Sequence, residues 1–227
     1  PKQRQTLLFS ATIDRSITNN MKSLLNDPAV VEIAHKGETA DTVEQYIIRT
    51  PQTVKAALLK AVLEEKGSDR VIVFARTRSR ADSTSRRLKR AGYTVEAIHS
   101  DRSQNQRKRA LERFANGEAN IIVATDVLAR GIDVPEVNYV INMDLPSQPE
   151  DYVHRIGRTG RAGQNGFAVS FVSPDTESAL RDIQKLIKRE IPEMELANFD
   201  FAAAEAEAVQ KSQNAQARRD PELAQAK

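Results

Sequence analysis

The chain has 227 residues, of which 40% are hydrophobic and 29% are charged. This balance allows one full globular domain with flanking pieces, and the formal net charge of +3 indicates no partner by itself. The chain has no cysteine, which excludes disulfide frameworks and thiolate metal sites and fits a reducing compartment, so we expect a cytoplasmic location.

A structural metal site and a membrane segment are not expected. The three histidines, His35, His99 and His154, are dispersed and lack the spacing of metal ligands. No apolar run approaches the ~20 residues that span a bilayer, and no signal peptide is visible. The first residue is Pro1 rather than methionine, so the sequence leaves an upstream targeting signal open.

Short apolar runs rich in Val and Ile alternate with helical patterns along the chain. Strands are predicted at 6–12, 45–50, 70–75, 93–99, 120–125, 139–144 and 167–172. Helices are predicted at about 14–26, 52–65, 77–91, 104–115 and 175–189. The continuous apolar character of the strands is typical of a buried parallel sheet, and the alternation predicts a doubly wound α/β fold. In such folds ligands bind at the carboxyl ends of the strands.

Two changes of composition predict the domain organisation. The polar segment 35–42 separates a first strand and helix, within 1–34, from the main domain at 43–191. We interpret 1–34 as the last βα unit of a preceding domain and 35–42 as a linker. Residues 192–227 are rich in Ala, Gln and charge without a sizeable apolar face, which predicts a flexible polar tail, either a frayed helix or disordered.

Positive charge is concentrated in two places. Between Arg76 and Arg113 there are twelve Lys or Arg against four acids, which indicates either a solvated helix face or a footprint for a nucleic-acid backbone. Further on, HRIGRTGRAG places Arg155, Arg158 and Arg161 at three-residue spacing among glycines. Guanidinium groups are rarely buried unpaired and match phosphate oxygens, so this segment indicates a polyanion site; the alternative is a basic surface turn.

Five segments resemble, in order and spacing, the later motifs of DEAD-box RNA helicases. They are SAT (10–12), VIVFARTR (71–78), QNQR (104–107), ATDVLARGID (124–133) and HRIGRTGR (154–161). The resemblance covers roughly residues 5 to 190 and is closest to the bacterial RhlE-like subgroup. It implies a RecA-like doubly wound parallel sheet with helices on both faces, plus the polar tail. The phosphate-binding loop and the DEAD acidic motif of the family's first RecA-like domain do not occur in this chain.

The resemblance implies a nucleotide site that uses ATP, with Mg²⁺ held by the missing N-terminal domain. Arg158 and Arg161 match the arginine-finger positions that stabilise charge on the transferring phosphoryl group. Gly131 would let the backbone approach the nucleotide, and Asp133 would bind ribose hydroxyls; the alternative for Asp133 is a turn or cap residue before Pro135.

Three further residues match positions that couple the nucleotide and RNA sides in the family. They are Ser10, Thr12 and His154. His154 could instead be an ordinary structural histidine. The related DEAH and RecQ groups usually carry Gln at its position, which favours the DEAD-box group.

The resemblance also implies contacts to the RNA backbone, without sequence specificity. The matching residues are Arg76, Gln104, Arg107, Thr125, Arg130 and Gly131. Asp126 is expected to orient its neighbours through hydrogen bonds rather than to touch phosphate. One departure is Ser100, because the family commonly has Gly there and Ser restricts positive φ.

The predicted function is the C-terminal half of an ATP-dependent RNA helicase that separates short duplexes locally. Its partners would be RNA and its own N-terminal RecA-like domain, with protein or RNA contacts through the tail and no membrane. The chain alone is expected to lack ATPase activity. The alternatives are a non-catalytic RNA-binding or interaction module on a helicase scaffold, and a DNA-directed helicase, which His154 disfavours.

Overall fold

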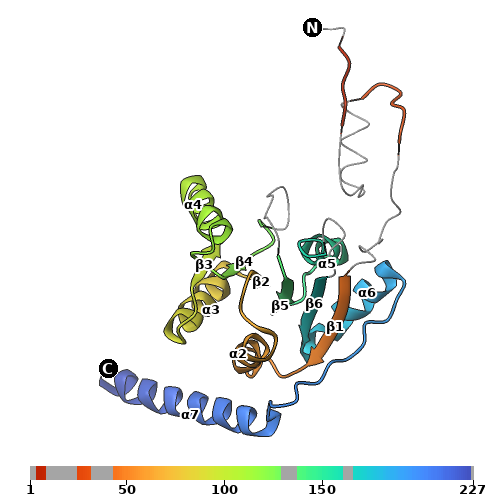
Figure 1. Cartoon of the computed structure of the whole chain (residues 1–227). Helices are drawn as coiled ribbons and strands as arrows, with labels where there is room; N and C mark the ends of the chain where they lie inside the picture. The colour runs from red at the N-terminus through yellow and green to blue at the C-terminus, as the bar shows by residue number, and fades with distance from the viewer. Residues whose placement is uncertain (1–3, 9–24, 32–42, 129–136, 161–165, 226–227) are drawn as a thin grey trace.

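One parallel sheet of six strands forms the centre of the computed structural model (Figure 1). The structure describes residues 4–8, 25–31, 43–128, 137–160 and 166–225. The strands follow the order β1-β6-β5-β2-β4-β3, and every neighbouring pair is parallel. Their bounds are β1 Val43–Arg49, β2 Val71–Phe74, β3 Val95–Ile98, β4 Ile121–Ala124, β5 Tyr139–Asn142 and β6 Gly166–Val172.

Six of the seven predicted strands are confirmed. The central strands β2, β4 and β5 are buried along their whole length, as their continuous apolar sequences predict. The strand predicted at 6–12 is not found in its described part, because residues 6–8 form no regular structure, and the rest lies outside the described ranges. The helix predicted at 14–26 and the linker at 35–42 also fall almost entirely outside them.

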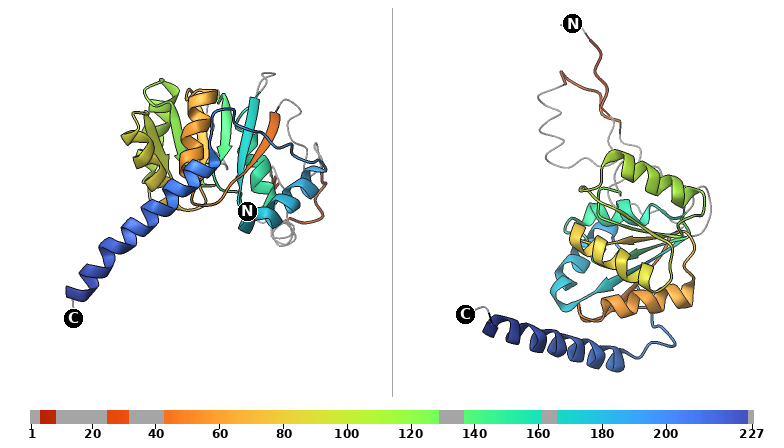
Figure 2. Two further views of the ribbon diagram at one scale, coloured as in Figure 1. Left: turned by 90° about the horizontal axis from the view of Figure 1, so that it is seen from below. Right: turned by 90° about the vertical axis from the view of Figure 1, so that its left-hand side faces the viewer.

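Helices cover both faces of the sheet, which confirms the doubly wound prediction (Figure 2). Their bounds are α2 Lys55–Lys66, α3 Arg78–Arg90, α4 Gln104–Ala115, α5 Pro149–Ile156, α6 Glu177–Ile187 and α7 Phe201–Gln225, with a 3₁₀ turn at Pro174–Thr176. A hydrophobic core lies on each face of the sheet, and alternate residues of a strand point into one core or the other. In β2, Ile72 belongs to the core formed with α4, α5 and α6, while Val73 belongs to the core formed with α2 and α3. No described helix is both long and apolar enough to cross a membrane.

Helix α5 was absent from the sequence prediction. It is only eight residues long and carries polar residues within its buried face, including Asp151 and Arg155. A helix of this length has only about two turns in which an apolar period can be seen, and it depends on tertiary packing for its stability. Pro149 begins the helix, where the missing N–H costs nothing, and Gly157 follows it.

The ordered packing continues past the domain boundary predicted at residue 191. The Ile47 N–H donates to the Pro192 carbonyl and the Met194 N–H donates to the Ile47 carbonyl, both at 2.9 Å, which covers the outer edge of β1. Leu196 is buried against the α2–α3 side of the sheet, and Phe199 and Phe201 stack edge to face at 4.7 Å. Residues 192–201 thus belong to the packed domain, and helix α7 follows.

Leu196→Ala should lower the free energy of unfolding by about 2 kcal/mol, because it removes a buried side chain from the hydrophobic core on the α2–α3 side of the sheet. Leu196 is 6% exposed, whereas Val209 on α7 is 49% exposed. Val209→Ala is therefore the matched control and should change stability by less than about 0.5 kcal/mol. Urea unfolding followed by tyrosine fluorescence measures both. Equal effects of the two substitutions would show that residues 192–201 do not contribute to the fold.

Candidate functional site

Two of the predicted RNA-contacting residues follow neighbouring strands at the carboxyl edge of the sheet. Strands β2 and β4 pair directly, with Phe74 opposite Ala124, and the pairing continues through the Ala75 N–H to the Ala124 carbonyl at 2.9 Å. Arg76 and Thr125 come one step later on each strand. Arg76 is exposed and Thr125 is buried. The structure therefore brings these two residues together, as the sequence predicted.

The start of α4 holds Gln104 and Arg107 beside this edge. Ser103 caps the helix, with its hydroxyl accepting from the Gln106 N–H and the Gln106 side chain accepting from the Ser103 N–H. Gln104 is left exposed. The Arg107 Nε donates to the Arg102 carbonyl at 3.0 Å, which fixes the guanidinium against the turn that precedes the helix.

That turn is also held from α3. Asp82 lies 3.1 Å from the Nε2 of the buried His99 and 2.7 Å from an amine of Arg102. Burial raises the pKa of the Asp82 carboxyl, but the hydrogen bond with His99 and the charge of Arg102 outweigh it, so the net pKa is lowered. Ser100 does not adopt positive φ, so the Ser at this position costs the turn nothing.

The prediction that Arg155 belongs to a polyanion site with Arg158 and Arg161 is wrong. Arg155 is fully buried and binds Asp126 with two parallel contacts, Nε to Oδ1 at 2.6 Å and an amine to Oδ2 at 3.0 Å. It also donates to Asn142 Oδ1 at 3.3 Å and to the Asp144 carbonyl at 2.7 Å. Its guanidinium stands 5.0 Å from the centre of the Phe74 ring. Arg155 is therefore a paired interior residue and not a phosphate ligand, and Asp126 forms the hydrogen bonds to a neighbour that the sequence predicted.

His154 lies in the last turn of α5, and Arg158 comes two residues after the helix ends at Ile156. His154 is half-buried, and its Nδ1 is 3.8 Å from Asp151 and makes no hydrogen bond within the described residues. The Arg158 Nε donates to the His154 carbonyl at 3.3 Å. The next residue, Thr159, donates to the carbonyls of Val137 and Asn138 at 2.7 and 2.9 Å, just before β5 begins.

Close backbone packing fixes the segment after α5. Gly166 begins β6 beside it, and a Cβ there would lie 2.2 Å from the Thr159 hydroxyl and 2.4 Å from the Gly160 nitrogen. A side chain at Gly166 would therefore displace Thr159 and Gly160, and with them Arg158. Thr159, the residue after Arg158, is thus fixed just before β5 begins, whereas Arg76 and Thr125 follow the carboxyl ends of β2 and β4.

Six predicted site residues lie outside the described ranges. They are Ser10, Thr12, Arg130, Gly131, Asp133 and Arg161. Their roles therefore remain predictions from the sequence.

The basic region between Arg76 and Arg113 divides into two kinds of cation. Some pair with carboxylates: Arg78 with Asp101, Arg102 with Asp82, and Arg113 with both Glu96 and Glu118. Others are exposed at the end of α3 and form no ion pair within the described part of the chain. These are Arg86, Arg87, Lys89 and Arg90. The solvated-face interpretation therefore fits the paired cations, and the footprint interpretation stays open for the rest.

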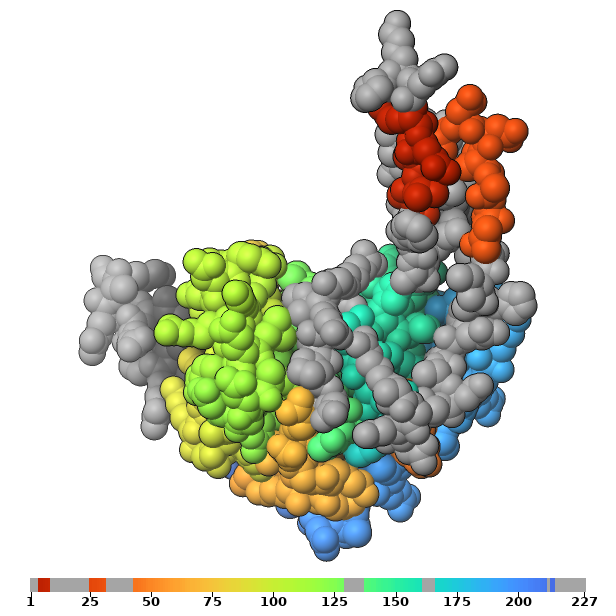
Figure 3. Space-filling view, turned by 45° about the horizontal axis from the view of Figure 1, so that its top comes forward, coloured from red at the N-terminus to blue at the C-terminus, as the bar shows by residue number. Residues whose placement is uncertain are grey.

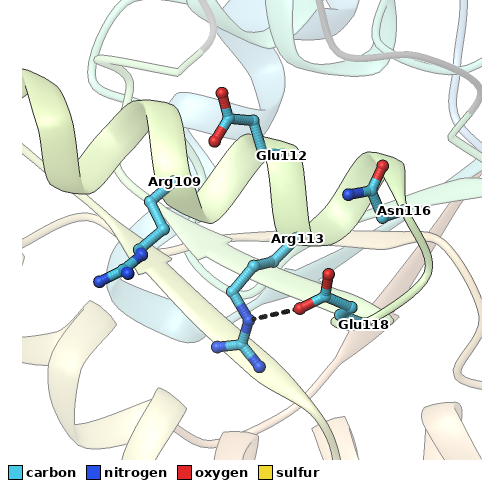
Figure 4. Close-up of a pocket in the computed structure, with 5 residues that line it drawn as sticks. All are labelled: Arg109, Glu112, Arg113, Asn116 and Glu118. Atoms are coloured by element: carbon cyan, nitrogen blue, oxygen red, sulfur yellow. Dashed lines mark hydrogen bonds and ion pairs between the residues drawn. The ribbon is translucent and has the colours of Figure 1, made fainter.

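A pocket of about 490 Å³ lies at the carboxyl end of α4 (Figure 4). It is lined by Arg109, Glu112, Arg113, Asn116 and Glu118. The Arg113 Nε donates to Glu118 at 3.3 Å, so part of its charge is already neutralised. Helix α4 stands at the molecular surface here (Figure 3), and none of the predicted site residues lines the pocket.

Sequence reasoning missed the role of a second buried charge cluster, at the carboxyl end of β5. Asp144 is buried there and lies within 3.5 Å of Lys55, which is itself fully buried at the start of α2. Burial lowers the pKa of the Lys55 amine, and the Asp144 carboxylate opposes that shift. The position of Asp144 just after a predicted strand was the signal available, but its partner Lys55 is 89 residues away in the chain.

Comparisons with known proteins point to one family. Residues 54–163 match the helicase conserved C-terminal domain. The chain is 41% identical over 202 residues to the DEAD-box ATP-dependent RNA helicase CshA of Geobacillus kaustophilus, covering 89% of this chain and 43% of that relative. The chain thus spans less than half the length of that protein.

Two solved structures are similar as well. One is the E. coli DEAD-box protein SrmB bound to regulator of ribonuclease activity A, at 36% identity and a TM-score of 0.64, covering 67% of this chain and 91% of that one. The other is S. cerevisiae Dbp5 bound to RNA and ADP BeF3, at 30% identity and a TM-score of 0.78, covering 92% of this chain and 56% of that one. The fold, the order of the motifs and these similarities together show that the chain belongs to the DEAD-box RNA helicases and corresponds to their C-terminal RecA-like domain.

Proposed function

We propose that this chain forms the C-terminal half of an ATP-dependent helicase that couples ATP hydrolysis to the local separation of RNA duplexes. The observation that carries the proposal is the pair of Arg155 and Asp126. It fastens the end of β4, where Thr125 lies, to helix α5, which ends just before Arg158. The pair thereby connects Thr125, on the RNA side, to the helix that precedes Arg158, on the nucleotide side.

On the nucleotide side, ATP is the substrate and Arg158 and Arg161 stabilise the negative charge that spreads over the transferring phosphoryl oxygens. Gly131 and Asp133 contact the nucleotide. The structure of Dbp5 with ADP BeF3 supports a nucleotide at this kind of domain. Within the described residues no three carboxylate or imidazole groups gather as metal ligands. Mg²⁺ is held by the N-terminal RecA-like domain.

On the RNA side, guanidinium and hydroxyl groups at the carboxyl edge hold the sugar–phosphate backbone of one strand. The contacting residues are Arg76, Gln104, Arg107, Thr125, Arg130 and Gly131. Such contacts position the strand and read no sequence, and recognition of a 2′-hydroxyl would favour RNA over DNA. His154, Ser10 and Thr12 couple RNA binding to ATP hydrolysis when the two RecA-like domains close. The protein acts in the cytoplasm, and residues 192–227 offer a place for further protein or RNA contacts.

The test is ATP hydrolysis by this chain alone, and by this chain joined to the N-terminal RecA-like domain of a relative such as CshA, each with and without single-stranded RNA. Activity is expected only in the joined protein, and RNA should increase it several-fold over the basal rate. A joined protein that is folded and binds RNA but does not hydrolyse ATP would favour the non-catalytic binding module. Equal stimulation by DNA would contradict the assignment of RNA as the substrate.

A further inference from the structure

Asp144 collects groups from three separate elements at one point. Its Oδ2 accepts a hydrogen bond from the main-chain N–H of Arg76 at 3.1 Å, just after β2. The Arg80 Nε, in the first turn of α3, lies 2.9 Å from the same oxygen as an ion pair without the angle of a hydrogen bond. The Lys55 Nζ, at the start of α2, is 3.5 Å from Oδ1. The carboxylate therefore joins β2, α2 and α3.

Stability alone does not account for this arrangement. The side chains of Lys55 and Asp144 are 0% and 4% exposed. Removing two charges from water is so costly that well-packed apolar side chains of similar volume are often as stabilising as a buried ion pair. A buried pair of this kind is thus better explained by the position that it gives to its neighbours.

The residue whose position the buried pair fixes is Arg76. Its main chain is held by Asp144, and the following turn is held by Thr77, whose hydroxyl accepts from the Arg80 N–H at 3.2 Å. Arg78 is occupied by Asp101. The Arg76 side chain, in contrast, is exposed and makes no hydrogen bond or ion pair with any described residue. A fixed main chain therefore presents a guanidinium that is left for a ligand.

We propose that Asp144 is a positioning residue for RNA binding, which acts by holding the main chain of Arg76 so that its guanidinium meets a phosphate of the bound strand. This inference rests on the proposed function, because it needs Arg76 to contact RNA. Asp144 itself touches no RNA, since it is buried and a carboxylate would repel phosphate.

The test is a mutant cycle in the joined two-domain protein, with kcat and the KM for RNA read from RNA-stimulated ATP hydrolysis. Asp144→Ala is combined with Lys55→Met, so that no buried charge is left without a partner. This variant should raise the KM for RNA about tenfold, the order of magnitude of one charge-assisted phosphate contact, and leave kcat within about twofold. Asp144→Asn with Lys55→Met should restore most of the affinity, because its amide oxygen can still accept from the Arg76 N–H.

Arg76→Ala decides between positioning and a general structural role. On its own, Arg76→Ala should raise the KM for RNA about tenfold. Adding Asp144→Ala and Lys55→Met should raise the KM no further, because Asp144 acts only through Arg76 and the two effects are then not additive. If the alanine variant does not fold, Asp144→Glu with Lys55 retained moves the carboxylate by one methylene and keeps the charges paired. Its effect on the KM for RNA should likewise disappear when Arg76 is already alanine.

The outcomes separate this inference from the function on which it rests. Two results would overturn the positioning role and leave the helicase function intact. One is an unchanged KM for RNA in the Asp144→Ala and Lys55→Met protein. The other is a combined variant in which the KM increases caused by Arg76→Ala and by the Asp144→Ala and Lys55→Met pair multiply. A parent protein that is folded but shows no RNA-stimulated hydrolysis would overturn the proposed function, and this inference with it.

Discussion

Asp126→Ala is expected to lower the free energy of unfolding by about 3 kcal/mol, at the lower end of the range for breaking a buried ion pair. The reason is the guanidinium of Arg155, whose side chain is 0% exposed. Without Asp126 it would keep only the oxygens of Asn142 and Asp144 as hydrogen-bond partners among the described residues. Asp126 itself is 37% exposed, so water reaches its side of the pair and limits the loss. Urea unfolding of the chain measures the change.

An exposed ion pair on the same domain provides the control. Arg78 and Asp101 pair at the surface, with side chains 58% and 57% exposed, and such pairs contribute about 0–1 kcal/mol. Asp101→Ala should therefore have a small effect. Equal losses for Asp126→Ala and Asp101→Ala would contradict the structural role of Arg155.

A double substitution tests the same pair from the other side. Asp126→Ala with Arg155→Met removes both charges and keeps much of the buried volume, so it should recover part of the stability lost in Asp126→Ala alone. The two changes would then be non-additive. A simple sum of the single losses would show that the residues act independently.

The strands were predictable because a fully buried parallel strand must be apolar on both faces. The apolar runs at 70–75 and 120–125 therefore predict β2 and β4. The juxtaposition of Arg76 and Thr125 then follows from the rule that ligands gather at the carboxyl ends of such strands.

The partners of buried charges could not be predicted in this way. Arg155 and Arg158 stand in the same glycine-containing segment, and the sequence does not distinguish one from the other. Only the fold shows that Arg155 turns inward to Asp126, 29 residues away, while Arg158 follows the end of the helix. Lys55 likewise occupies a helical pattern in which a lysine normally lies in solvent. Its burial depends on Asp144, and that contact is formed only when α2 packs against the sheet.

Arg158→Ala should lower RNA-stimulated ATP hydrolysis by about 10³-fold or more in the joined two-domain protein, with RNA affinity within about twofold of the parent. A guanidinium that meets the transferring phosphoryl group stabilises charge only in the transition state, so its loss lowers kcat. The structure supports a fixed position for it, since the Arg158 Nε donates to the His154 carbonyl and Thr159 is anchored to Val137 and Asn138. Arg158 lies away from Arg76 and Thr125, so RNA binding should persist.

Two further substitutions sharpen this result. Arg158→Lys keeps the charge and loses the planar fork, so it should also be strongly impaired, although less than alanine. Arg181, which is exposed on α6, serves as the matched control, and Arg181→Ala should leave turnover unchanged. Steady-state kcat and an RNA-binding titration on the same preparations separate the two sides of the site. Full turnover in Arg158→Ala would remove this residue from the nucleotide site, whereas a parallel loss of RNA affinity would place it on the RNA side instead.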